Sequence, residues 1–460
     1  MYRYSGLMKL ISIKQKKLYK VIMNSFDKLP DFVERYLKKF SFNDWTISND
    51  HNKLFDNVIV IPSLAEFEQL PHCLKSLEQN DLSLLNKTLV LVVINNSVSA
   101  DDEIKSNNKR TIQLLKSYNS TLNLSFIDAA TKGNELPDNF AGVGFARKIG
   151  CDLALKKFDY SSGRKKIIFF LDADCTVSSD YLLKVTSEFH KKDLHSAVIE
   201  YEHPYSENSS EAEAIICYEI FLRYHRLGLK FAKSYYDYNT IGSTIVCDVE
   251  SYIKAGGMNK RKAGEDYYFL EKLAKLGRIS TVSEPLVYPS SRKSWRVPFG
   301  TGQRITRHLS KKQDEYVGYN PESFKILKNW LNYFSSENVI DTKSILNKAK
   351  EINTGLYYFL INQNFERDWE RILKNNQSAE EIQKQKIYWF DAFRTLKLIH
   401  YLRDNGFPNI NLFDAVDLLF QWLNIKSNIR RDSEIPDIKI QKQYLLFLRK
   451  ILRERFFDDN

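Results

Sequence analysis

The chain has 460 residues, 43% hydrophobic and 27% charged, with 68 Lys and Arg against 57 Asp and Glu. This composition indicates a folded protein of two or three domains and excludes disordered, collagen-like and small disulfide-stapled proteins. The net charge of +11 suits a polyanionic ligand or an anionic membrane surface without identifying either. There is no secretory-signal pattern, no apolar run approaches the roughly 18 residues of a membrane-spanning helix, and the five cysteines form no C-x-x-C pair. We therefore expect a cytoplasmic protein with free thiols.

Three zones are expected along the chain: an N-terminal helical extension (1–55), a region that alternates strands and helices (56–305) and a helical C-terminal domain (306–460). In the second zone, β-rich apolar runs at 57–61, ended by Pro62, and at 89–94, 124–127 and 166–171 are separated by helical spacing at 67–79, 104–118 and 144–158. Continuous aliphatic strands separated by helices predict an α/β fold, with a mostly parallel sheet covered on both faces. Ligands of such sheets bind beyond the carboxyl ends of the strands.

Two carboxylates follow the most apolar of these runs. Asp172 and Asp174 stand two residues apart, so they project to the same side if the extended conformation continues. Mg²⁺ and Mn²⁺ prefer oxygen ligands, usually one or two carboxylates completed by water and substrate phosphates. The alternative is that both residues only end the strand or cap the next helix. That helix already has Ser178, Ser179 and Asp180 as capping candidates, which favours a metal–diphosphate site.

A second acidic pair lies at the start of a predicted helix. Glu265 and Asp266 follow Gly264 and precede apolar residues at helical spacing. Acidic residues in a first turn are expected merely to complement the helix dipole. The functional alternative is that one of them removes the proton from an attacking hydroxyl.

Together, these motifs resemble those of glycosyltransferases of the GT-A fold, specifically the inverting family 2 type. The resemblance covers about 250 residues and rests on the following segments in order: Val58-Ile59-Val60-Ile61-Pro62, Gly142-Val143-Gly144-Phe145-Ala146-Arg147-Lys148-Ile149-Gly150, Asp172-Ala173-Asp174, Gly242-Ser243, Gly256-Gly257 and Glu265-Asp266. It implies transfer of a sugar from a nucleoside-diphosphate donor to a hydroxyl of a glycan or lipid-linked acceptor in polysaccharide biosynthesis. The transfer would be a direct displacement assisted by Mn²⁺ or Mg²⁺.

The resemblance also implies roles for individual residues. Asp174, with Asp172, would hold the divalent metal that bridges the two donor phosphates. Asp266 would be the catalytic base, kept ionised by its helix N-terminus, and Glu265 would position the sugar or acceptor. Arg147 would neutralise phosphate or orient the donor.

Other donor-site candidates match the family less closely. The family's Asp-Asp-Gly-Ser turn, in which an aspartate reads the nucleobase, is replaced by Asn95 and Asn96, whose amides can both donate and accept hydrogen bonds. Lys148 stands where asparagine is usual, which would add a phosphate contact. Pro62 ends the opening strand, and Glu66 is the acid that remains after it.

A basic loop at 291–304 supplies two phosphate candidates, Arg292 and Arg296, because arginine pairs bidentately with phosphate. A solvated surface loop is the alternative. The Q-x-x-R-W motif of processive synthases is not matched, because Gln303 and Arg307 are one residue too far apart and His308 follows them.

The C-terminal region has helix signals throughout. Ser378 opens a capping box for a helix that is predicted to continue to Asn405-Gly406, and Asn411 precedes another. In the last helix, the apolar stripe around Leu448 is flanked by basic residues: Arg449, Lys450, Arg453 and Arg455. This pattern, like the basic N-terminal stretch around Lys17, permits ordinary packing or peripheral attachment to an anionic membrane.

Three other functions compete with glycosyl transfer. A sugar nucleotidylyltransferase should have a glycine- and arginine-rich loop after its first strand, and Ser63-Leu64-Ala65 is no such loop. A catalytically silent glycan-binding or scaffold protein stays open because of the altered Asn95-Asn96 turn. Nucleic-acid binding is disfavoured, since the aromatic residues follow no RNA-binding motif.

Overall fold

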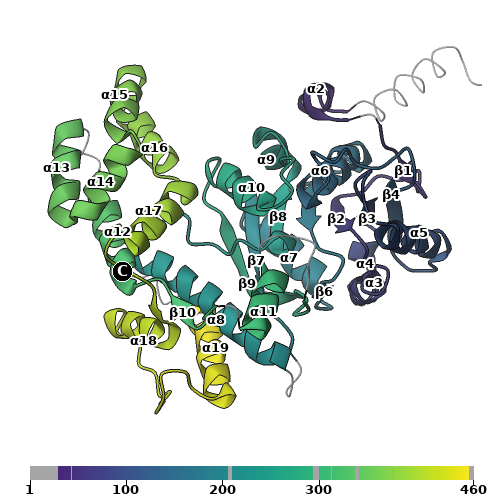
Figure 1. The fold of residues 1–460 in the computed structure, drawn as a ribbon. Coiled ribbons are helices and arrows are strands. Elements are labelled where there is room, and N and C mark those ends of the chain that lie inside the picture. The colour runs from purple at the N-terminus through teal and green to yellow at the C-terminus, as the bar shows by residue number, and fades with distance from the viewer. Residues whose placement is uncertain are drawn as a thin grey trace, which may run out of the picture.

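The computed structural model describes residues 29–42, 44–205, 210–293, 300–311, 313–336, 341–376 and 378–454. An α/β region is built on a nine-stranded sheet of order β1-β4-β3-β2-β5-β8-β7-β9-β6, and C-terminal helices lie beside it (Figure 1). The strands are β1 (Ile47–Ser48), β2 (Asn57–Ser63), β3 (Thr88–Asn95), β4 (Asn123–Ala129), β5 (Ile167–Phe170), β6 (Thr176–Val177), β7 (Ser196–Tyr201), β8 (Ile245–Asp248) and β9 (Ser280–Tyr288). The expected α/β class with a mostly parallel sheet is confirmed.

The parallel strands bring their carboxyl ends to one edge of the sheet. β2 pairs in parallel with β3 and β5, β3 with β4, and β7 with β9, whereas β8 runs antiparallel between β5 and β7. The prediction that Pro62 ends its strand is wrong, because β2 continues in register with β3 through Pro62 to Ser63. Pairing with β5 has already ended at Val60, so a residue without an N–H is tolerated here.

Helices cover both faces of the sheet because alternate residues of each strand point to opposite faces. Val58 and Val60 pack with α2, α6, α9 and α10, whereas Ile59 and Ile61 pack with α3, α5 and α7 on the other face. These helices, with the short α4, are α2 (Asp31–Phe40), α3 (Leu70–Glu78), α4 (Leu82–Leu85), α5 (Asp102–Ser117), α6 (Val143–Ala154), α7 (Tyr181–Lys191), α9 (Val249–Lys254) and α10 (Glu265–Ala274). α6 lies close to the sheet, since a Cβ at Gly150 would be 2.5 Å from Val60.

The predicted N-terminal extension contributes to the α/β layers. α2 buries Tyr36 and Leu37, and the Tyr36 hydroxyl donates to Asp152 Oδ1 on α6 at 2.9 Å. β1 adds an antiparallel edge strand beside β4. Residues 31–48 therefore belong structurally to the sheet and its helical layer.

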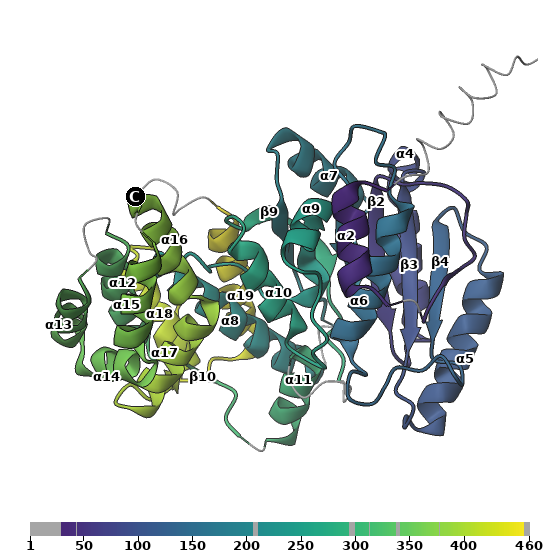
Figure 2. The ribbon, with the colours of Figure 1, turned by 90° about the horizontal axis from the view of Figure 1, so that it is seen from above.

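The 22-residue helix α8 (Ser210–Phe231) joins the two halves of the molecule. Apolar residues of α8 from Ile216 to Phe231 share one core with the C-terminal helices, which lie side by side beyond the sheet in Figure 2. Those helices, with α11 beside α8, are α11 (Thr301–Ser310), α12 (Pro321–Phe334), α13 (Thr342–Ile352), α14 (Thr354–Asn362), α15 (Phe365–Asn375), α16 (Ala379–Trp389), α17 (Ala392–Asp404), α18 (Leu412–Trp422) and α19 (Ile438–Arg453). The region is helical apart from the short pairing of β10 (Val317–Gly318) with β11 (Ile410–Asn411).

The prediction of one long helix from Ser378 to Asn405-Gly406 is wrong. Ser378 does cap α16, accepting from Glu381 N at 3.2 Å, but α16 ends at Trp389. Asp391 then caps the separate helix α17, accepting from Arg394 N at 2.9 Å, and accepts from Lys275 Nζ of the α/β region at 3.2 Å. The break between α16 and α17 thus lets Asp391 bond to the α/β region.

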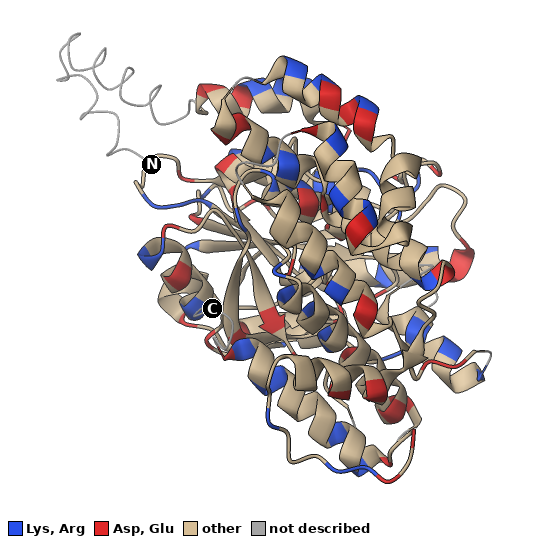
Figure 3. Ribbon diagram, turned by 90° about the vertical axis from the view of Figure 1, so that its left-hand side faces the viewer, with Lys and Arg blue, Asp and Glu red and all other residues tan. Residues whose placement is uncertain are grey.

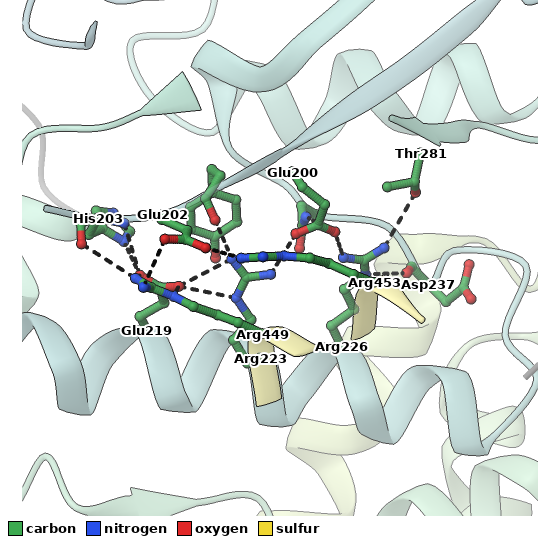
Figure 4. A network of polar contacts seen from close by, with 12 residues as sticks. Glu200, Glu202, His203, Glu219, Arg223, Arg226, Asp237, Thr281, Arg449 and Arg453 are labelled. Carbon is green, nitrogen blue, oxygen red and sulfur yellow. Dashed lines mark hydrogen bonds and ion pairs between the residues drawn. The ribbon is translucent and has the colours of Figure 1, made fainter. Parts of the chain in front are cut away.

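A buried network of ion pairs fastens α19 to α8 and β7 (Figure 4). Glu219 on α8 accepts from Arg449 Nε at 2.8 Å and pairs with Arg223 at 3.1 Å. Arg449 also contacts Glu202 at 3.1 Å, and Arg453 pairs with Glu202. These two basic residues of the final helix therefore face inward, which favours packing over a membrane-binding face; Arg455 and the stretch around Lys17 lie outside the described residues.

Charge is dispersed over the described surface, with Lys and Arg interspersed among Asp and Glu along the helices (Figure 3). Among the described residues, no helix combines the length and apolar character needed to span a bilayer. All five cysteines are buried and unpaired, as the sequence led us to expect.

Replacing Arg449 by alanine should lower the free energy of unfolding by about 3 kcal/mol, because it removes one partner of the buried Glu219 carboxylate. Urea denaturation followed by circular dichroism measures the change. Lys450→Ala on the exposed face of the same helix is the matched control and should stay within about 0.5 kcal/mol of the wild type. Equal effects of the two substitutions would contradict a structural role for the network.

Candidate active site

Acidic residues converge at the edge of the sheet where the parallel strands end. Asp172 and Asp174 follow β5, and their side chains keep 35% and 22% of their surface exposed. Glu66 follows the neighbouring β2 and is 5% exposed. Because β8 runs antiparallel to β5, the turn Gly242–Thr244 that precedes β8 lies at the same edge.

Arg147 connects the two acidic motifs. Its buried guanidinium, on α6, donates to Asp172 after β5 and to Glu265 at the start of α10. A Cβ at Gly242 would be 2.6 Å from both terminal nitrogens of Arg147, so only glycine leaves room for this arrangement. At Gly144 a Cβ would be 2.8 Å from the Glu265 Cβ, so glycine also allows α6 to dock against α10. Gly144 and Gly242 are thus required by the close packing around Arg147.

Glu265 and Asp266 are both shielded from water. Glu265 is 3% exposed, and burial raises its pKa to about 7 against the opposing charge of Arg147. Burial also raises the pKa of the half-buried Asp266, with Arg147 again opposing and Asp172 adding to the rise. The sequence predicted that the helix N-terminus keeps Asp266 ionised, but burial instead raises the pKa of this carboxyl. A raised pKa makes a carboxylate a stronger base.

Arg292 joins the second carboxylate of β5 to Glu66. Its Nη2 donates to Glu66 Oε1 at 2.6 Å and to Asp174 Oδ2 at 3.1 Å. Burial raises the pKa of Asp174, and the Arg292 charge opposes that rise. The structure therefore contains two bridging arginines at this edge, each between carboxylates from different segments.

The remaining predicted donor-site residues are placed differently. Pro62 and Asn95 lie at the carboxyl ends of β2 and β3, and Asn96 follows directly. Asn96 Oδ1 accepts from Asn108 at 2.8 Å, whereas the buried Asn95 Oδ1 accepts no hydrogen bond within the described residues.

Lys148 is not brought to this edge. Its Nζ pairs with Asp152 at 2.9 Å and reaches the Tyr36 hydroxyl at 3.1 Å, in the layer between α6 and α2. The predicted phosphate contact of Lys148 therefore needs correction, because its ammonium group is taken up by Asp152 and Tyr36. Arg296 lies outside the described residues.

The carboxylates after β5 suit a metal ion that takes its remaining ligands from a substrate. Over the described ranges, no three His, Cys, Asp or Glu side chains gather to hold an ion. Mg²⁺ and Mn²⁺ commonly take only one or two carboxylates and complete their coordination with phosphate oxygens. The partly exposed Asp172 and Asp174 offer that donor set, with Arg292 as the competing cation at Asp174.

No protein-family model matches the chain, and no curated protein sequence matches it. Among solved structures, the chain is similar to residues 1–349 of TarS from S. aureus in complex with UDP-GlcNAc (12% identity, TM-score 0.38, covering 71% of this chain and 89% of that one). It is also similar to the mannosyltransferase PcManGT from Pyrobaculum calidifontis in complex with GDP-Man and Mn²⁺ (14% identity, TM-score 0.34, covering 85% and 92%). These neighbours are glycosyltransferases. Likenesses this distant carry no argument about the substrates of this chain.

Tyr218 on α8, which the sequence did not single out, interacts electrostatically with Asp266. Burial raises the pKa of its phenol to about 12; the Arg304 charge opposes the rise and the Asp266 carboxylate adds to it. The available signal was the spacing of Tyr218, Phe221 and His225, which places three rings on one helix face.

Stability should depend on the Glu265 proton. Because its folded pKa is about 7, the folded state binds more protons than the unfolded state above the ordinary value of 4.5. The resulting stabilisation is present at low pH and is lost as pH rises through about 7. Urea denaturation between pH 4.5 and 7 should show the free energy of unfolding of the wild type falling with pH relative to that of Glu265→Gln, which has no proton to lose at this position. A difference that stays constant with pH would contradict the raised pKa.

Proposed function

We propose that this protein is a metal-assisted, inverting glycosyltransferase of the family 2 type. It moves a sugar from a nucleoside-diphosphate donor to a hydroxyl of a glycan or lipid-linked acceptor. The observation that carries the proposal is the convergence of Asp172, Asp174, Glu265 and Asp266 at one edge of the sheet, with Arg147 between the two acidic pairs. This arrangement supports a site that holds a charged donor on one side and deprotonates an acceptor on the other.

Asp266 is proposed as the catalytic base. It takes the proton of the acceptor hydroxyl as that oxygen bonds to the anomeric carbon, and the bond from this carbon to the diphosphate oxygen breaks. The electron pair of that bond leaves with the nucleoside diphosphate. Because the oxygen attacks opposite the leaving group, the anomeric configuration inverts, and no enzyme nucleophile is needed. Burial at Asp266 supports this role by making its carboxylate more basic.

Glu265 and Arg147 are proposed to position the reacting groups. Arg147 is held by Asp172 and Glu265. From this position beside the carboxylate proposed to hold the metal, its guanidinium would orient the sugar or its phosphates. Glu265 holds that guanidinium from the acceptor side. Removing either would leave a buried charge without its partner.

The metal would be held by Asp174 and Asp172. When bound, it supplies positive charge that offsets the charge developing on the leaving diphosphate. Arg292 lies at the same carboxylate and can pair with phosphate once it leaves Glu66 and Asp174. Arg296, from the same loop, stays a phosphate candidate on sequence grounds.

The nucleobase is proposed to lie at the ends of β2 and β3. Asn95 Oδ1 is an unused acceptor there and suits the ring N–H that both uracil and guanine present. The side chain therefore supports base recognition without choosing between the two. Pro62 and Asn96 would complete this part of the pocket.

Asp174→Ala should abolish metal-dependent donor binding, because it removes the carboxylate proposed to hold the cation. Thermal shift with UDP, GDP and their sugars, with and without Mn²⁺, measures this. The wild type should gain melting temperature only when nucleotide and Mn²⁺ are both present. Asp404→Ala, an exposed aspartate on α17, is the control and should respond like the wild type. An unchanged response in Asp174→Ala would contradict the metal assignment.

Asp266→Asn should bind donor like the wild type but lose sugar transfer by at least about 100-fold, since it keeps the shape of the side chain and loses the base. The measurements are the same thermal shift and a radiolabelled sugar-transfer assay. Full transfer by this variant would overturn the base assignment. Donor binding by the wild type without transfer to any hydroxyl acceptor would instead favour the silent binding protein.

A further inference from the structure

A groove of positive charge lies on helix α5, at the side of the α/β region remote from the C-terminal helices (Figure 2). It has a volume of about 1050 Å³ and lies between α5, the turn after β3 and the loop after β4. We call it the lysine groove, after the four lysines that line it: Lys105, Lys109, Lys116 and Lys132. The proposed sugar transfer uses none of these lysines.

Helix α5 presents three of the lysines on one face. Lys105, Lys109 and Lys116 follow the spacing i, i+4 and i+11, which places them around the buried Ile112. At about 1.5 Å per residue, the row extends over about 16 Å. Lys105 Nζ also donates to the carbonyl oxygen of Val98 at 3.0 Å. Like charges four residues apart destabilise a helix, so a row of this kind is typical of a ligand site.

Most of these lysines have no anionic partner in the protein. Lys109, Lys116 and Lys132 are exposed and form no ion pair or hydrogen bond within the ranges that the structure describes. Arg110, the next residue along α5, differs from them, since it pairs with Glu68 at 3.3 Å. The charge of the groove is therefore available to a ligand.

The acidic residues of the neighbouring loop are engaged by backbone N–H groups. Asp128 Oδ1 accepts from Thr131 N at 2.9 Å, and the Glu135 carboxylate accepts from Gly133 N. These bonds shape the loop that carries Lys132. Glu135 is the only acidic residue among those described as lining the groove, so the four lysines leave it with a net positive charge.

The rest of the lining suits a chain of sugars or polyols. Gln113 and Thr131 offer an amide and a hydroxyl to the hydroxyls of such a chain, and Val98, Ile112 and Ala130 offer apolar surface to its C–H groups. Lysine is a flexible point charge that pairs with phosphate or carboxylate without a fixed geometry. None of the described residues that line the groove is aromatic, so it lacks the rings on which nucleic-acid bases stack.

We propose that the lysine groove binds an anionic glycan, a chain of sugars or polyols that bears phosphate or carboxylate groups. The chain lies along α5 with its charges at the lysines. The groove borders the carboxyl ends of β3 and β4, whereas Asp172 and Asp174 follow β5. β3 and β5 are separated by β2, which puts them about 10 Å apart. The groove is therefore a second site, and its binding requires neither the metal nor the nucleotide.

The test is fluorescence anisotropy with labelled hexagalacturonate, which bears carboxylates, a labelled glycerol-phosphate hexamer, which bears phosphates, and the neutral maltohexaose. At least one anionic hexamer should bind at least about tenfold more tightly than maltohexaose, with an affinity that falls as salt is added. The double variant Lys109→Glu and Lys116→Glu should lose at least about tenfold in affinity for it, because both charges then repel the chain.

The matched control is the double variant Lys343→Glu and Lys439→Glu. It changes the net charge by the same amount at exposed lysines of α13 and α19, and should bind like the wild type. All four substituted side chains are exposed, so both variants should keep the wild-type circular dichroism spectrum. Asp174→Ala should also keep the affinity for the anionic hexamer, because the groove is separate from the candidate active site.

Three outcomes would overturn the proposal. Neither anionic hexamer binds more tightly than maltohexaose, the groove and control variants lose affinity equally, or Asp174→Ala loses the binding. Tighter binding of a single-stranded RNA hexamer than of both anionic glycans would overturn the ligand class. The nucleotide thermal shift plays no part in this test, so the lysine groove and the proposed sugar transfer can fail independently.

Discussion

The buried guanidinium of Arg147 is the interaction on which the site depends. It lies between Asp172, which follows a central strand, and Glu265, which begins a helix 93 positions later in the chain. Asp172 and Glu265, which both pair with this guanidinium, would repel each other without a cation between them. The space for this cation exists because Gly242 lacks a side chain. The charge of Arg147 and the lack of a side chain at Gly242 thus keep the two acidic motifs together.

The second arginine acts in a different environment. Arg292 is partly exposed and lies on the loop after β9, so its contacts with Glu66 and Asp174 cost less to break than those of Arg147. Arg147 is therefore the arginine whose contacts are fixed, and Arg292 is the one whose contacts can be exchanged. This division agrees with the proposed reaction, in which a cation and a charged donor arrive and leave during each turnover.

The C-terminal helices are integrated with the α/β region through α8. One side of α8 belongs to their apolar core, and another side is tied to α19 by Glu219 and Arg449. The boundary predicted near residue 305 thus separates sequence zones that share a core in space.

The sequence by itself determined the parallel strands, their helices and the two acidic pairs, because these depend on local periodicity and on residues next to each other in the chain. It could not determine that β8 runs antiparallel, that Lys148 turns to Asp152 while Arg147 turns to Glu265, or that Asp391 breaks a helix. These features depend on which segments meet in space. The raised pKa values of Glu265 and Asp266 likewise follow from burial and from contacts between distant segments, which only the tertiary structure decided.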